Sequence, residues 1–512
     1  MRPVDAPLLG GILATDQYQL TMAEAYWRDG LADRPAMFDF FFRSLPDYGS
    51  HQAGYAVLAG LGWFVRWLDT VRVTDADIEY LATQATPAGD PRFEPAFLDW
   101  LSDAGGFGAL TVTGVPEGRV VHPNTPLLTV EGPLALAQLV ETPLLNALNY
   151  PTLVATKASR VVDATGGAPV LEFGMRRGPE AGADAGARAA LIGGCTATSN
   201  VALSATVGVP PAGTHAHSFV QAHLALGHGE VEAFRAYAAT HPDECLLLVD
   251  TIDTLTSGVP NAITVFSELR AAGHEPLGVR LDSGDLANLA VQTARMLDDA
   301  GFEDTSIVLS GDLDELVIWQ IRSQVREEAP ALGLDPDAVD GRLTYGVGTR
   351  LITSHGAPSL NGVYKLVAVA DAGGRWHPAV KVSEDPRKVP APGRKRLVRL
   401  RDRRGRATAD VVALVEEPAS PEAWDLRHPY EDVGRALAAD EVSDVEDLHV
   451  ELFGPDGRRV GDESIEELAD RRRADLDRLD PGVRRIVNPH RYHVSYTKEL
   501  RDLRDRLVGE LE

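Results

Sequence analysis

The middle of the chain alternates short apolar runs with helical stretches, and this alternation constrains the fold more than any other feature. Between residues 168 and 370 we expect strands at 168–173, 212–216, 245–250, 276–282, 305–310, 343–348 and 363–370. The helices expected between them include 261–272, 286–300 and 313–323. Continuously apolar strands separated by helices are typical of parallel βαβ units that are buried on both faces. Six or seven such units predict an α/β barrel rather than an open sheet.

The first part of the chain mixes strand and helix patterns. A strand is expected at 37–42, and helices are expected at 53–68, 93–101 and, as a pair interrupted at Pro143 and Pro151, at 134–165. Thr15 stands where it can cap a helix that begins at Asp16.

The last part mixes both patterns again, after a dense run of Lys and Arg at 381–406. A strand is expected near 409–415, and helices at 464–478 and 495–511. We therefore divide the chain into an N-terminal α+β part with linking helices (1–150), a barrel that carries the active site (151–370) and a C-terminal α+β part (371–512). We expect the C-terminal part to pack against the N-terminal one.

The charge balance and the cysteine count exclude several classes of protein. The chain has 49 Lys and Arg against 75 Asp and Glu, and this excess of acidic residues argues against a nucleic-acid partner. Cys195 and Cys245 form no CxxC pair, so we expect no structural zinc, whereas a disulfide between them stays open. No run approaches about 18 apolar residues, and the N-terminus lacks the apolar stretch of a signal peptide. We expect no membrane contact and a cytoplasmic location.

Polar and glycine-rich sequence follows almost every strand of the middle region. In a barrel, reactive groups gather at the carboxyl ends of the strands. The residues that fall there are Arg176 and Arg177, His217 and Ser218, Asp250 and Asp253, Arg280, Asp282, Ser283 and Asp285, Gly311 and Asp312, and Gly346, Gly348 and Thr349. Their shared position, more than any one of them, predicts the site.

These residue types suit a sugar phosphate. The segment GVGTR (346–350) can present backbone N–H groups and a hydroxyl to a phosphate at a helix start. Acidic residues in RLDSGD (280–285) suit ribose hydroxyls or Mg²⁺, and arginines suit carboxylate or phosphate. Each motif also has a structural interpretation. A GxGT segment is often a tight turn, and DSGD is often a helix cap. The two arginines can be a solvated pair, and His215 and His217 can both be structural. Tyr18 can be a core aromatic residue, and Glu172 can pair with an arginine.

Eight stretches, in the same order, resemble the nicotinate phosphoribosyltransferase family. They are TDQYQLTMAEAYW (15–27), EFGMRRG (172–178), GGCTATSNVALS (193–204), PPAGTHAHSFV (210–220), LLLVDTIDT (246–254), GVRLDSGDL (278–286), GVGTRL (346–351) and VYKLVAV (363–369). They span roughly residues 10 to 400, and the last hundred residues match only loosely.

The resemblance implies an irregular α/β barrel of the type II phosphoribosyltransferase kind, with a flanking α+β domain built from both chain ends. It also implies a homodimer whose active sites lie near the subunit interface. For nicotinate, the resemblance implies that Tyr18 stacks on the pyridine ring from the neighbouring subunit, that Arg280 and Thr214 contact the substrate, and that Ser199 lies beside the ring substituent. It implies that Arg176 holds the anionic substrates, that Asp282 lies on the ribose side, and that the 5′-phosphate is bound by Gly346, Gly348 and Thr349. It also implies that Ser383 contacts phosphoribosyl pyrophosphate and that His217 is the residue phosphorylated by ATP.

The activity that the resemblance implies is an ATP-coupled ligation. Nicotinate and phosphoribosyl pyrophosphate give nicotinate mononucleotide and pyrophosphate, a step of NAD salvage. Mg²⁺ is expected on the pyrophosphate, with Asp282 and Asp285 as candidate ligands. No zinc is expected, because no cysteine follows Cys245. The alternatives are a nicotinamide-specific enzyme, an inactive relative that serves as a sensor, and a barrel aldolase using Lys365.

Overall fold

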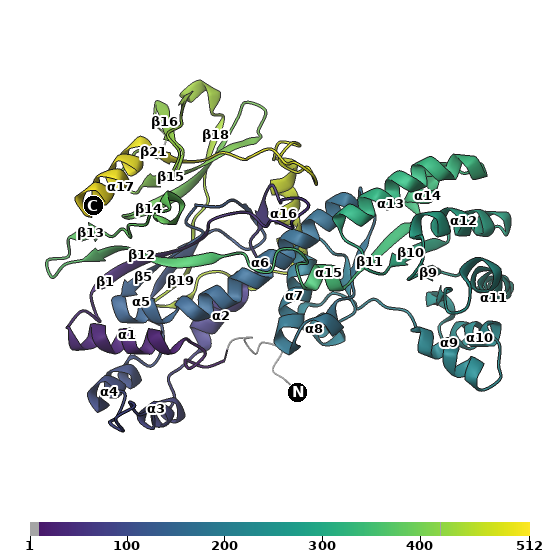
Figure 1. The fold of residues 1–512 in the computed structure, drawn as a ribbon, viewed down its shortest axis with the longest axis horizontal. Helices are drawn as coiled ribbons and strands as arrows, with labels where there is room; N and C mark the ends of the chain where they lie inside the picture. The colour runs from purple at the N-terminus through teal and green to yellow at the C-terminus, as the bar shows by residue number, and fades with distance from the viewer. Residues whose placement is uncertain (1–9, 420, 512) are drawn as a thin grey trace. The chain divides into compact units, whose positions relative to one another are not determined.

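The computed structural model describes residues 10–419 and 421–511, which form two compact units (Figure 1). One unit is Lys157–His355, and the other is built from both chain ends, up to Thr156 and from Gly356. The barrel unit is thus shorter at both ends than the expected range 151–370. The absence of a signal peptide was expected from the N-terminus, whose residues 1–9 lie outside the described residues.

The unit Lys157–His355 is built on a parallel sheet with the strand order β7-β6-β11-β10-β9-β8. The strands are β6 (Val170–Glu172), β7 (Ala197–Thr198), β8 (Leu246–Leu248), β9 (Gly278–Leu281), β10 (Ser306–Ser310) and β11 (Leu343–Val347). All five pairings are parallel. Five of the six strands lie inside ranges expected from their apolar runs, whereas β7 was not expected. The expected βαβ pattern is confirmed.

An extended segment at 211–216 connects the two edge strands β7 and β8, and it lies where a further strand was expected at 212–216. Pro211 forms a single parallel bridge with Thr198, and the Ala212 N–H donates to the Thr198 carbonyl at 2.9 Å. On the other side, the Leu248 N–H donates to His215 Nε2 at 3.1 Å. A side chain thus replaces part of a backbone ladder, and the sheet curls into an irregular barrel, as predicted.

Helices follow the strands of this unit. They are α7 (Glu180–Ile192), α8 (Val201–Val207), α9 (His217–Ala225), α10 (Glu230–Thr240), α11 (Val259–Ala271), α12 (Leu286–Asp299), α13 (Glu315–Glu328), α14 (Pro336–Gly341) and α15 (Thr349–Ile352). The helix α12 shows why they form: Asp285 caps it, and Leu286, Ala290 and Leu297 recur at helical spacing and are buried. Burying one such leucine contributes about 1.5–3 kcal/mol.

The unit formed by the chain ends contains a seven-stranded sheet with the order β13-β12-β1-β5-β3-β19-β20. Its strands are β1 (Pro35–Phe42), β3 (Thr111–Gly114), β5 (Leu128–Pro133), β12 (Gly362–Ala370), β13 (Trp376–Pro378), β19 (Val450–Gly454) and β20 (Gly457–Arg458). The strand β12, expected as the last barrel strand, instead pairs antiparallel with β1. Seven of the eight residues of β1 are buried, and an apolar strand such as β12 can pair beside it in the interior.

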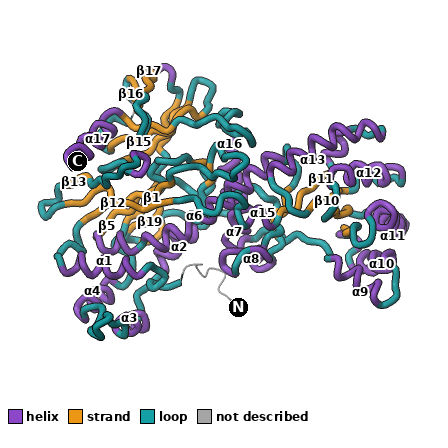
Figure 2. Tube along the Cα trace, in the orientation of Figure 1, coloured by secondary structure: helices purple, strands orange, loops and turns teal. Residues whose placement is uncertain are grey.

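A second sheet of this unit has the order β17-β16-β21-β15-β14-β18. Its strands are β14 (Lys395–Arg401), β15 (Ala407–Leu414), β16 (Ala423–Arg427), β17 (Gly434–Ala438), β18 (Asp444–Asp447) and β21 (Val494–Thr497). Figure 2 shows β15, β16 and β17 of this sheet close together. A short pair, β2 (Ala56–Val57) and β4 (Val120–Val121), completes the described strands. The helices are α1 (Gln17–Arg28), α2 (Leu61–Thr70), α3 (Asp75–Ala82), α4 (Pro95–Ala104), α5 (Leu134–Leu139), α6 (Glu141–Ala164, which continues into the other unit), α16 (Ile465–Asp477) and α17 (Lys498–Leu511).

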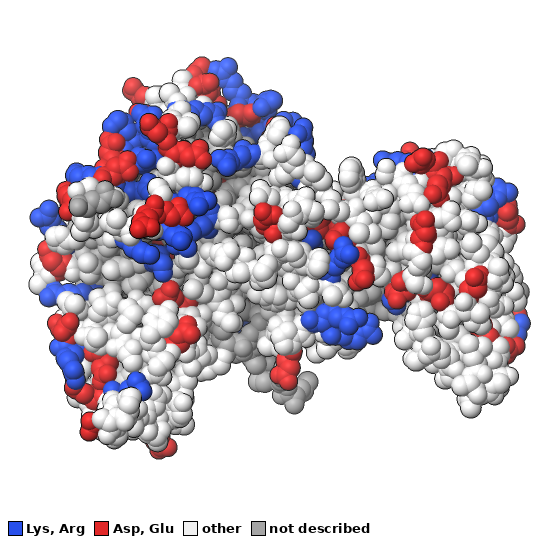
Figure 3. All heavy atoms as spheres, in the orientation of Figure 1, with Lys and Arg blue, Asp and Glu red and all other residues white. Residues whose placement is uncertain are grey.

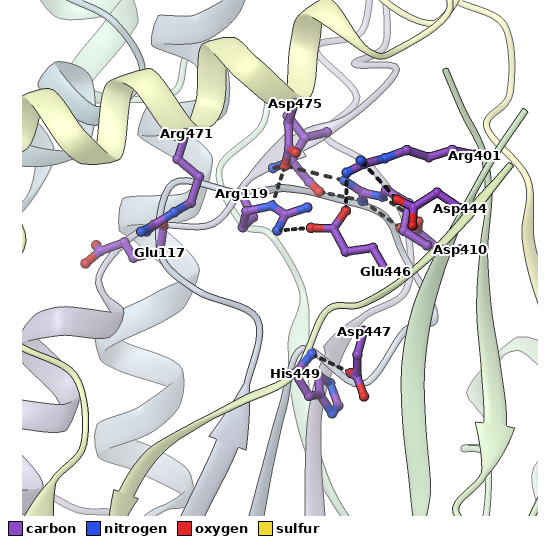
Figure 4. Close-up of polar contacts among 12 residues, drawn as sticks. Glu117, Arg119, Arg401, Asp410, Asp444, Glu446, Asp447, His449, Arg471 and Asp475 are labelled. Atoms are coloured by element: carbon purple, nitrogen blue, oxygen red, sulfur yellow. Dashed lines mark hydrogen bonds and ion pairs between the residues drawn. The ribbon is translucent and has the colours of Figure 1, made fainter. Parts of the chain in front are cut away.

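The basic run at 381–406 is largely neutralised within the unit. Arg399 forms a buried pair with Asp410, and Arg401 pairs with Asp444 and Glu446 (Figure 4). Arg403 pairs at the surface with an aspartate. On the face drawn in Figure 3, basic and acidic side chains lie beside one another. The run is therefore a set of internal ion pairs and not a polyanion-binding stripe.

Three local expectations in the first 165 residues were wrong. Thr15 makes no capping bond, and Asp16 is the N-cap residue of α1. The helix expected at 53–68 begins only at Leu61, after Gly60 with φ 97°. Pro151 lies inside α6 without ending it. Proline has no N–H for the carbonyl of Ala147, and Gly60 approaches that carbonyl so closely that a Cβ would lie 1.9 Å from it.

Candidate active site

The carboxyl edge of the parallel sheet gathers the polar side chains that follow the strands. Arg280 lies in β9, Asp282 follows that strand, and Ser310 ends the neighbouring β10. Asp282 accepts hydrogen bonds from Arg280 Nη2 at 2.8 Å and from Ser310 Oγ at 2.5 Å. Arg280 Nε also donates to Ser310 Oγ at 2.8 Å. These three residues form one cluster, of which the serine was not predicted.

The Asp282 carboxylate is held in its charged form. Burial by itself raises the pKa of Asp282, but the Ser310 hydrogen bond and the Arg280 charge outweigh it, so the pKa lies below its usual range. Its side chain is still one third exposed. The site thus contains a charged carboxylate that a cationic group can approach.

Arg280 also contacts two further groups on the substrate side. Its Nη1 lies 3.4 Å from Thr214 Oγ1, so the structure brings the two predicted nicotinate contacts together. Its guanidinium carbon lies 5.5 Å from the centroid of the Phe173 ring. A guanidinium beside an aromatic face suits a planar aromatic carboxylate. Phe173 was not predicted, because it reads as an ordinary core residue.

His217 begins α9 and points its ring at two carboxylates. Its Nε2 lies 3.9 Å from an Asp250 oxygen and 4.0 Å from an Asp282 oxygen. Its Nδ1 forms a hydrogen bond with Thr251 Oγ1 at 3.1 Å. The His217 side chain is 38% exposed.

Asp250 was noted in the sequence but not chosen as a site residue. Its side chain is 3% exposed, and one oxygen accepts from the Asp282 N–H at 3.0 Å and from Ser283 Oγ at 2.6 Å. The other oxygen, which faces His217, has no hydrogen-bond partner among the described residues. The rule that selected Asp282, a polar residue at a strand end, also selects Asp250.

His215 has a structural role. Its Nε2 accepts the Leu248 N–H, which requires the unprotonated form, and its ring lies among Phe219, Phe234 and Tyr237. Burial lowers the pKa of His215. The geometry therefore separates the two histidines: His217 faces the site, and His215 closes the barrel.

The glycine-rich turn after β11 is shaped by close packing. A Cβ on Gly346 would lie 2.6 Å from the Phe173 ring. Gly348 is the N-cap of α15, and Thr349 is the first residue of that helix. The N–H groups of a first helical turn have no partners within the helix, so this turn can present donors to a phosphate. Arg350 pairs with Asp314 at 2.6 Å and thereby ties the turn to α13.

Ser199 and Asp285 both lie just before a helix, where a polar side chain can serve as the N-cap. The cap of α8 is Asn200, whose side chain accepts the Leu203 N–H, so Ser199 is not the capping residue. Asp285 does cap α12, and it accepts from Gln324 Nε2 at 3.2 Å. For Asp285 the structural interpretation therefore applies.

For the remaining candidate residues, the structure gives mainly their position and exposure. Arg176 lies in an exposed 3₁₀ turn at Met175–Arg177. Tyr18, which is 49% exposed on α1, and the partly buried Ser383 belong to the unit of the chain ends. Lys365 lies in β12 of that unit, with Nζ 3.7 Å from Glu141. A Schiff-base lysine in the barrel is thus not supported by the one candidate that the sequence offered.

Three observations bear on cofactors, redox state and membranes. Within residues 10–419 and 421–511, no group of three or more His, Cys, Asp or Glu side chains is arranged to hold a metal ion. Cys195 and Cys245 are both buried, and neither forms a disulfide. Among the described helices, none is both long and apolar enough to cross a membrane.

Comparisons with known proteins cover nearly the whole chain. The models of the nicotinate phosphoribosyltransferase N-terminal domain, family and C-terminal domain match residues 13–149, 169–392 and 394–504. The nicotinate phosphoribosyltransferase of Bacillus subtilis is 38% identical over 511 residues, which cover 98% of this chain and 97% of the relative. The human enzyme is 35% identical, with coverages of 97% and 96%.

Solved structures agree with these sequence matches. The crystal structure of human nicotinic acid phosphoribosyltransferase superposes with a TM-score of 0.77 at 31% identity, covering 96% of this chain and 99% of that one. A nicotinate-nucleotide pyrophosphorylase from Pyrococcus furiosus superposes with a TM-score of 0.66 at 21% identity, with coverages of 91% and 95%, and shares the fold.

Proposed function

The chain belongs to the nicotinate phosphoribosyltransferase family, and from this membership we propose that it joins nicotinate to phosphoribosyl pyrophosphate in NAD biosynthesis. The products are nicotinate mononucleotide and pyrophosphate. We further propose that the step is coupled to ATP hydrolysis through a phosphorylated histidine, which makes the enzyme an ATP-coupled ligase.

The observation that carries the proposal is the cluster of Arg280, Asp282 and Ser310 beside the Phe173 ring. Arg280 supplies a cation for the nicotinate carboxylate, and Phe173 supplies a face for the pyridine ring. Asp282 supplies a carboxylate for the ribose side, and the turn with Gly348 supplies donors for the 5′-phosphate.

The bond-forming step follows from these charges. The pyridine nitrogen attacks C1 of the ribose, the C1–O bond breaks, and its electron pair leaves with pyrophosphate. Positive charge develops on the sugar, and the negative charge of Asp282 favours it electrostatically. The attacking nitrogen carries no proton, so the step needs no general base. Positioning of the two reactants supplies much of the remaining acceleration.

ATP hydrolysis uses His217 as a nucleophile. With its Nδ1–H donated to Thr251, Nε2 holds the free lone pair and attacks the γ-phosphorus, and ADP leaves with the electron pair of the broken bond. Water later cleaves the phosphohistidine and regenerates the imidazole and phosphate. The Thr251 hydrogen bond orients the ring, and Asp250 and Asp282 lie on its Nε2 side at 3.9 and 4.0 Å.

Mg²⁺ fits this site only together with a phosphate ligand. The hard cation prefers oxygen ligands, and Asp282 offers a partly exposed carboxylate, whereas Asp285 is occupied as a helix cap. Mg²⁺ bound to pyrophosphate offsets the negative charge that develops on the leaving group. We include no zinc in the proposal.

The assembly and the location are proposed together with the reaction. A homodimer would bring Tyr18 of one subunit to the pyridine ring bound by the other, and this tyrosine is half exposed. Two buried cysteines that form no disulfide suit the reducing cytoplasm. No nucleic-acid partner is proposed, since the net charge is −26.

A product assay tests the reaction. Purified protein is incubated with phosphoribosyl pyrophosphate, Mg²⁺ and either nicotinate, nicotinamide or quinolinate, with and without ATP, and the mononucleotides are measured by mass spectrometry. We expect nicotinate mononucleotide, ADP and phosphate. Product from nicotinamide alone would favour the amide-specific alternative, and binding without any product would favour the sensor.

A further inference from the structure

Glu172 is a fully buried carboxyl group at the carboxyl edge of the barrel that the proposed reaction does not use. It ends β6 and has no exposed surface. Burial raises the pKa of Glu172, because it disfavours the charged form of the carboxyl group. The sequence left open that it pairs with an arginine, but the hydrogen bonds of its side chain come from the Gly174 N–H and the Thr198 hydroxyl.

The Glu172 side chain bonds to β7, and the register partner of its backbone, Val347, lies on β11. The Thr198 hydroxyl belongs to β7, and the Ser199 N–H donates to the Glu172 backbone carbonyl at 2.9 Å. The same Thr198 oxygen accepts the Asn200 N–H at 3.0 Å, and Asn200 caps α8. The Glu172 carboxyl group thus holds Thr198 and, through it, the Asn200 cap, whereas the Glu172 backbone holds Ser199.

Thr198 also holds the segment that closes the barrel. Its carbonyl accepts the Ala212 N–H, two residues before Thr214, which contacts Arg280. On the other side of the Glu172 carboxyl group, the Gly174 bond fixes the turn that follows Phe173. Among the groups assigned to nicotinate, those of the barrel unit therefore connect to the residues around the Glu172–Thr198 pair, whereas Tyr18 belongs to the other unit. The phosphate turn follows β11, on the opposite side of β6.

We propose that the Glu172–Thr198 pair is a positioning element for the base-binding half of the site, setting the affinity for the aromatic acid and not that for the sugar phosphate. The inference rests on the proposed function, because it takes nicotinate as the ligand on the β7 side. Neither residue is assigned a contact with a substrate.

The test compares Thr198→Val with Thr198→Ser. Valine keeps the shape but removes the hydroxyl and leaves a buried Glu172 oxygen unpaired, whereas serine keeps the hydroxyl. We expect Thr198→Val to raise the KM for nicotinate roughly tenfold, the scale of one lost hydrogen bond with an unpaired buried partner. The KM for phosphoribosyl pyrophosphate and the kcat should change little. Thr198→Ser should behave as the wild type.

The control is Glu230→Gln, at another buried glutamate of the same unit that accepts from neutral donors, Ser257 and Asn261. It should leave both KM values unchanged. If Thr198→Val does not fold, as judged by its melting temperature, Glu172→Gln tests the same expectation with one acceptor oxygen fewer.

The outcomes separate the two proposals. A wild type that forms no mononucleotide removes the proposed function, and the inference with it. A wild type that does form product, together with a folded Thr198→Val whose KM for nicotinate is unchanged or whose two KM values rise equally, overturns the inference alone. Equal effects of the valine and serine variants would also overturn it.

Discussion

Ser199 is the residue at which the choice between nicotinate and nicotinamide is most directly tested. By resemblance, amide-specific relatives carry an aspartate at this place, and here the neutral Ser199 follows β7. We expect Ser199→Asp to raise the KM for nicotinate about tenfold or more and that for nicotinamide far less, because a carboxylate repels the acid and accepts from the amide NH₂.

Ser199→Asn is the matched variant for this prediction, because it has the size of aspartate without its charge. It should affect both substrates to a similar extent. Steady-state kinetics on the two substrates gives the comparison. If Ser199→Asp weakens nicotinate and nicotinamide equally, Ser199 does not discriminate between them.

We expect substitutions of His217 and His215 to have opposite effects on ATP coupling. His217→Asn should abolish ATPase activity and the stimulation by ATP, and should leave slow synthesis at high substrate concentration, because the phosphorylated imidazole acts on affinity. His215→Asn should keep the coupling, since His215 bonds to the Leu248 backbone and not to a ligand. Radiolabel from γ-labelled ATP that is acid-labile and base-stable on the protein reports the phosphohistidine.

One labelling result would contradict the assignment of His217 as the phosphorylated residue. Label that persists in His217→Asn and disappears in His215→Asn would reverse the assignment. His215→Asn also tests the barrel closure, because a melting temperature well below that of His217→Asn is expected for the buried residue.

The sequence predicts those site residues that directly follow a barrel strand. The strand-end rule selected His217, Asp282 and the turn at Gly348, and the structure brings the first two together. It did not select Phe173 or Ser310, because strand spacing does not show which side of a barrel strand faces the ligand. For Asp285 the sequence DSGD fits helix capping and metal binding alike, and the structure shows the capping bond.

The elements built from the two chain ends are joined by a buried ion-pair network (Figure 4). Arg399 on β14 makes two bonds to Asp410 on β15, approaches Asp475 on α16 at 3.4 Å and donates to the Val120 carbonyl of β4. Arg399 and Asp410 are at most 2% exposed. A single arginine thus connects an N-terminal strand to three C-terminal elements.

Arg399→Met should destabilise this unit strongly. Removing one partner of a buried pair leaves uncompensated carboxylates, so we expect the free energy of unfolding to fall by about 3–5 kcal/mol. The matched control is Arg403→Met, whose pair with Asp440 is two-thirds exposed, and which should change stability little. Urea denaturation of both variants tests the prediction. Equal midpoints would show that the network contributes no net stability.

Among the elements, those with a strong period were predictable and those shaped by distant partners were not. Five of the six barrel strands follow from their apolar runs, whereas the two-residue strand β7 was not predicted. The strand β12 has the same apolar character, but it completes the sheet around β1, which only the tertiary structure decides. Pro151 was expected to interrupt a helix, and the close approach of Gly60 to the Ala147 carbonyl is a long-range contact that no local pattern reveals.

For the whole molecule, the open question is whether each active site needs two subunits. Tyr18 lies on α1 in the unit of the chain ends, whereas Arg280 lies in the barrel unit. An aromatic side chain that is 49% exposed gains little stability where it is, and this exposure is what a residue that completes a neighbour's site would show. A closed dimer with twofold symmetry would place two identical sites at the interface.

Complementation between two inactive variants tests this arrangement. Tyr18→Ala and Arg280→Ala subunits are co-expressed with different affinity tags, and the heterodimer is purified through both tags. If Tyr18 acts across the interface, one of the two sites receives an intact tyrosine and an intact barrel, and the heterodimer should show about half the wild-type activity. If Tyr18 serves its own barrel, each site carries one lesion and the heterodimer should be as inactive as either parent. A purified wild type that sediments as a monomer under assay conditions and is fully active would contradict the shared site directly.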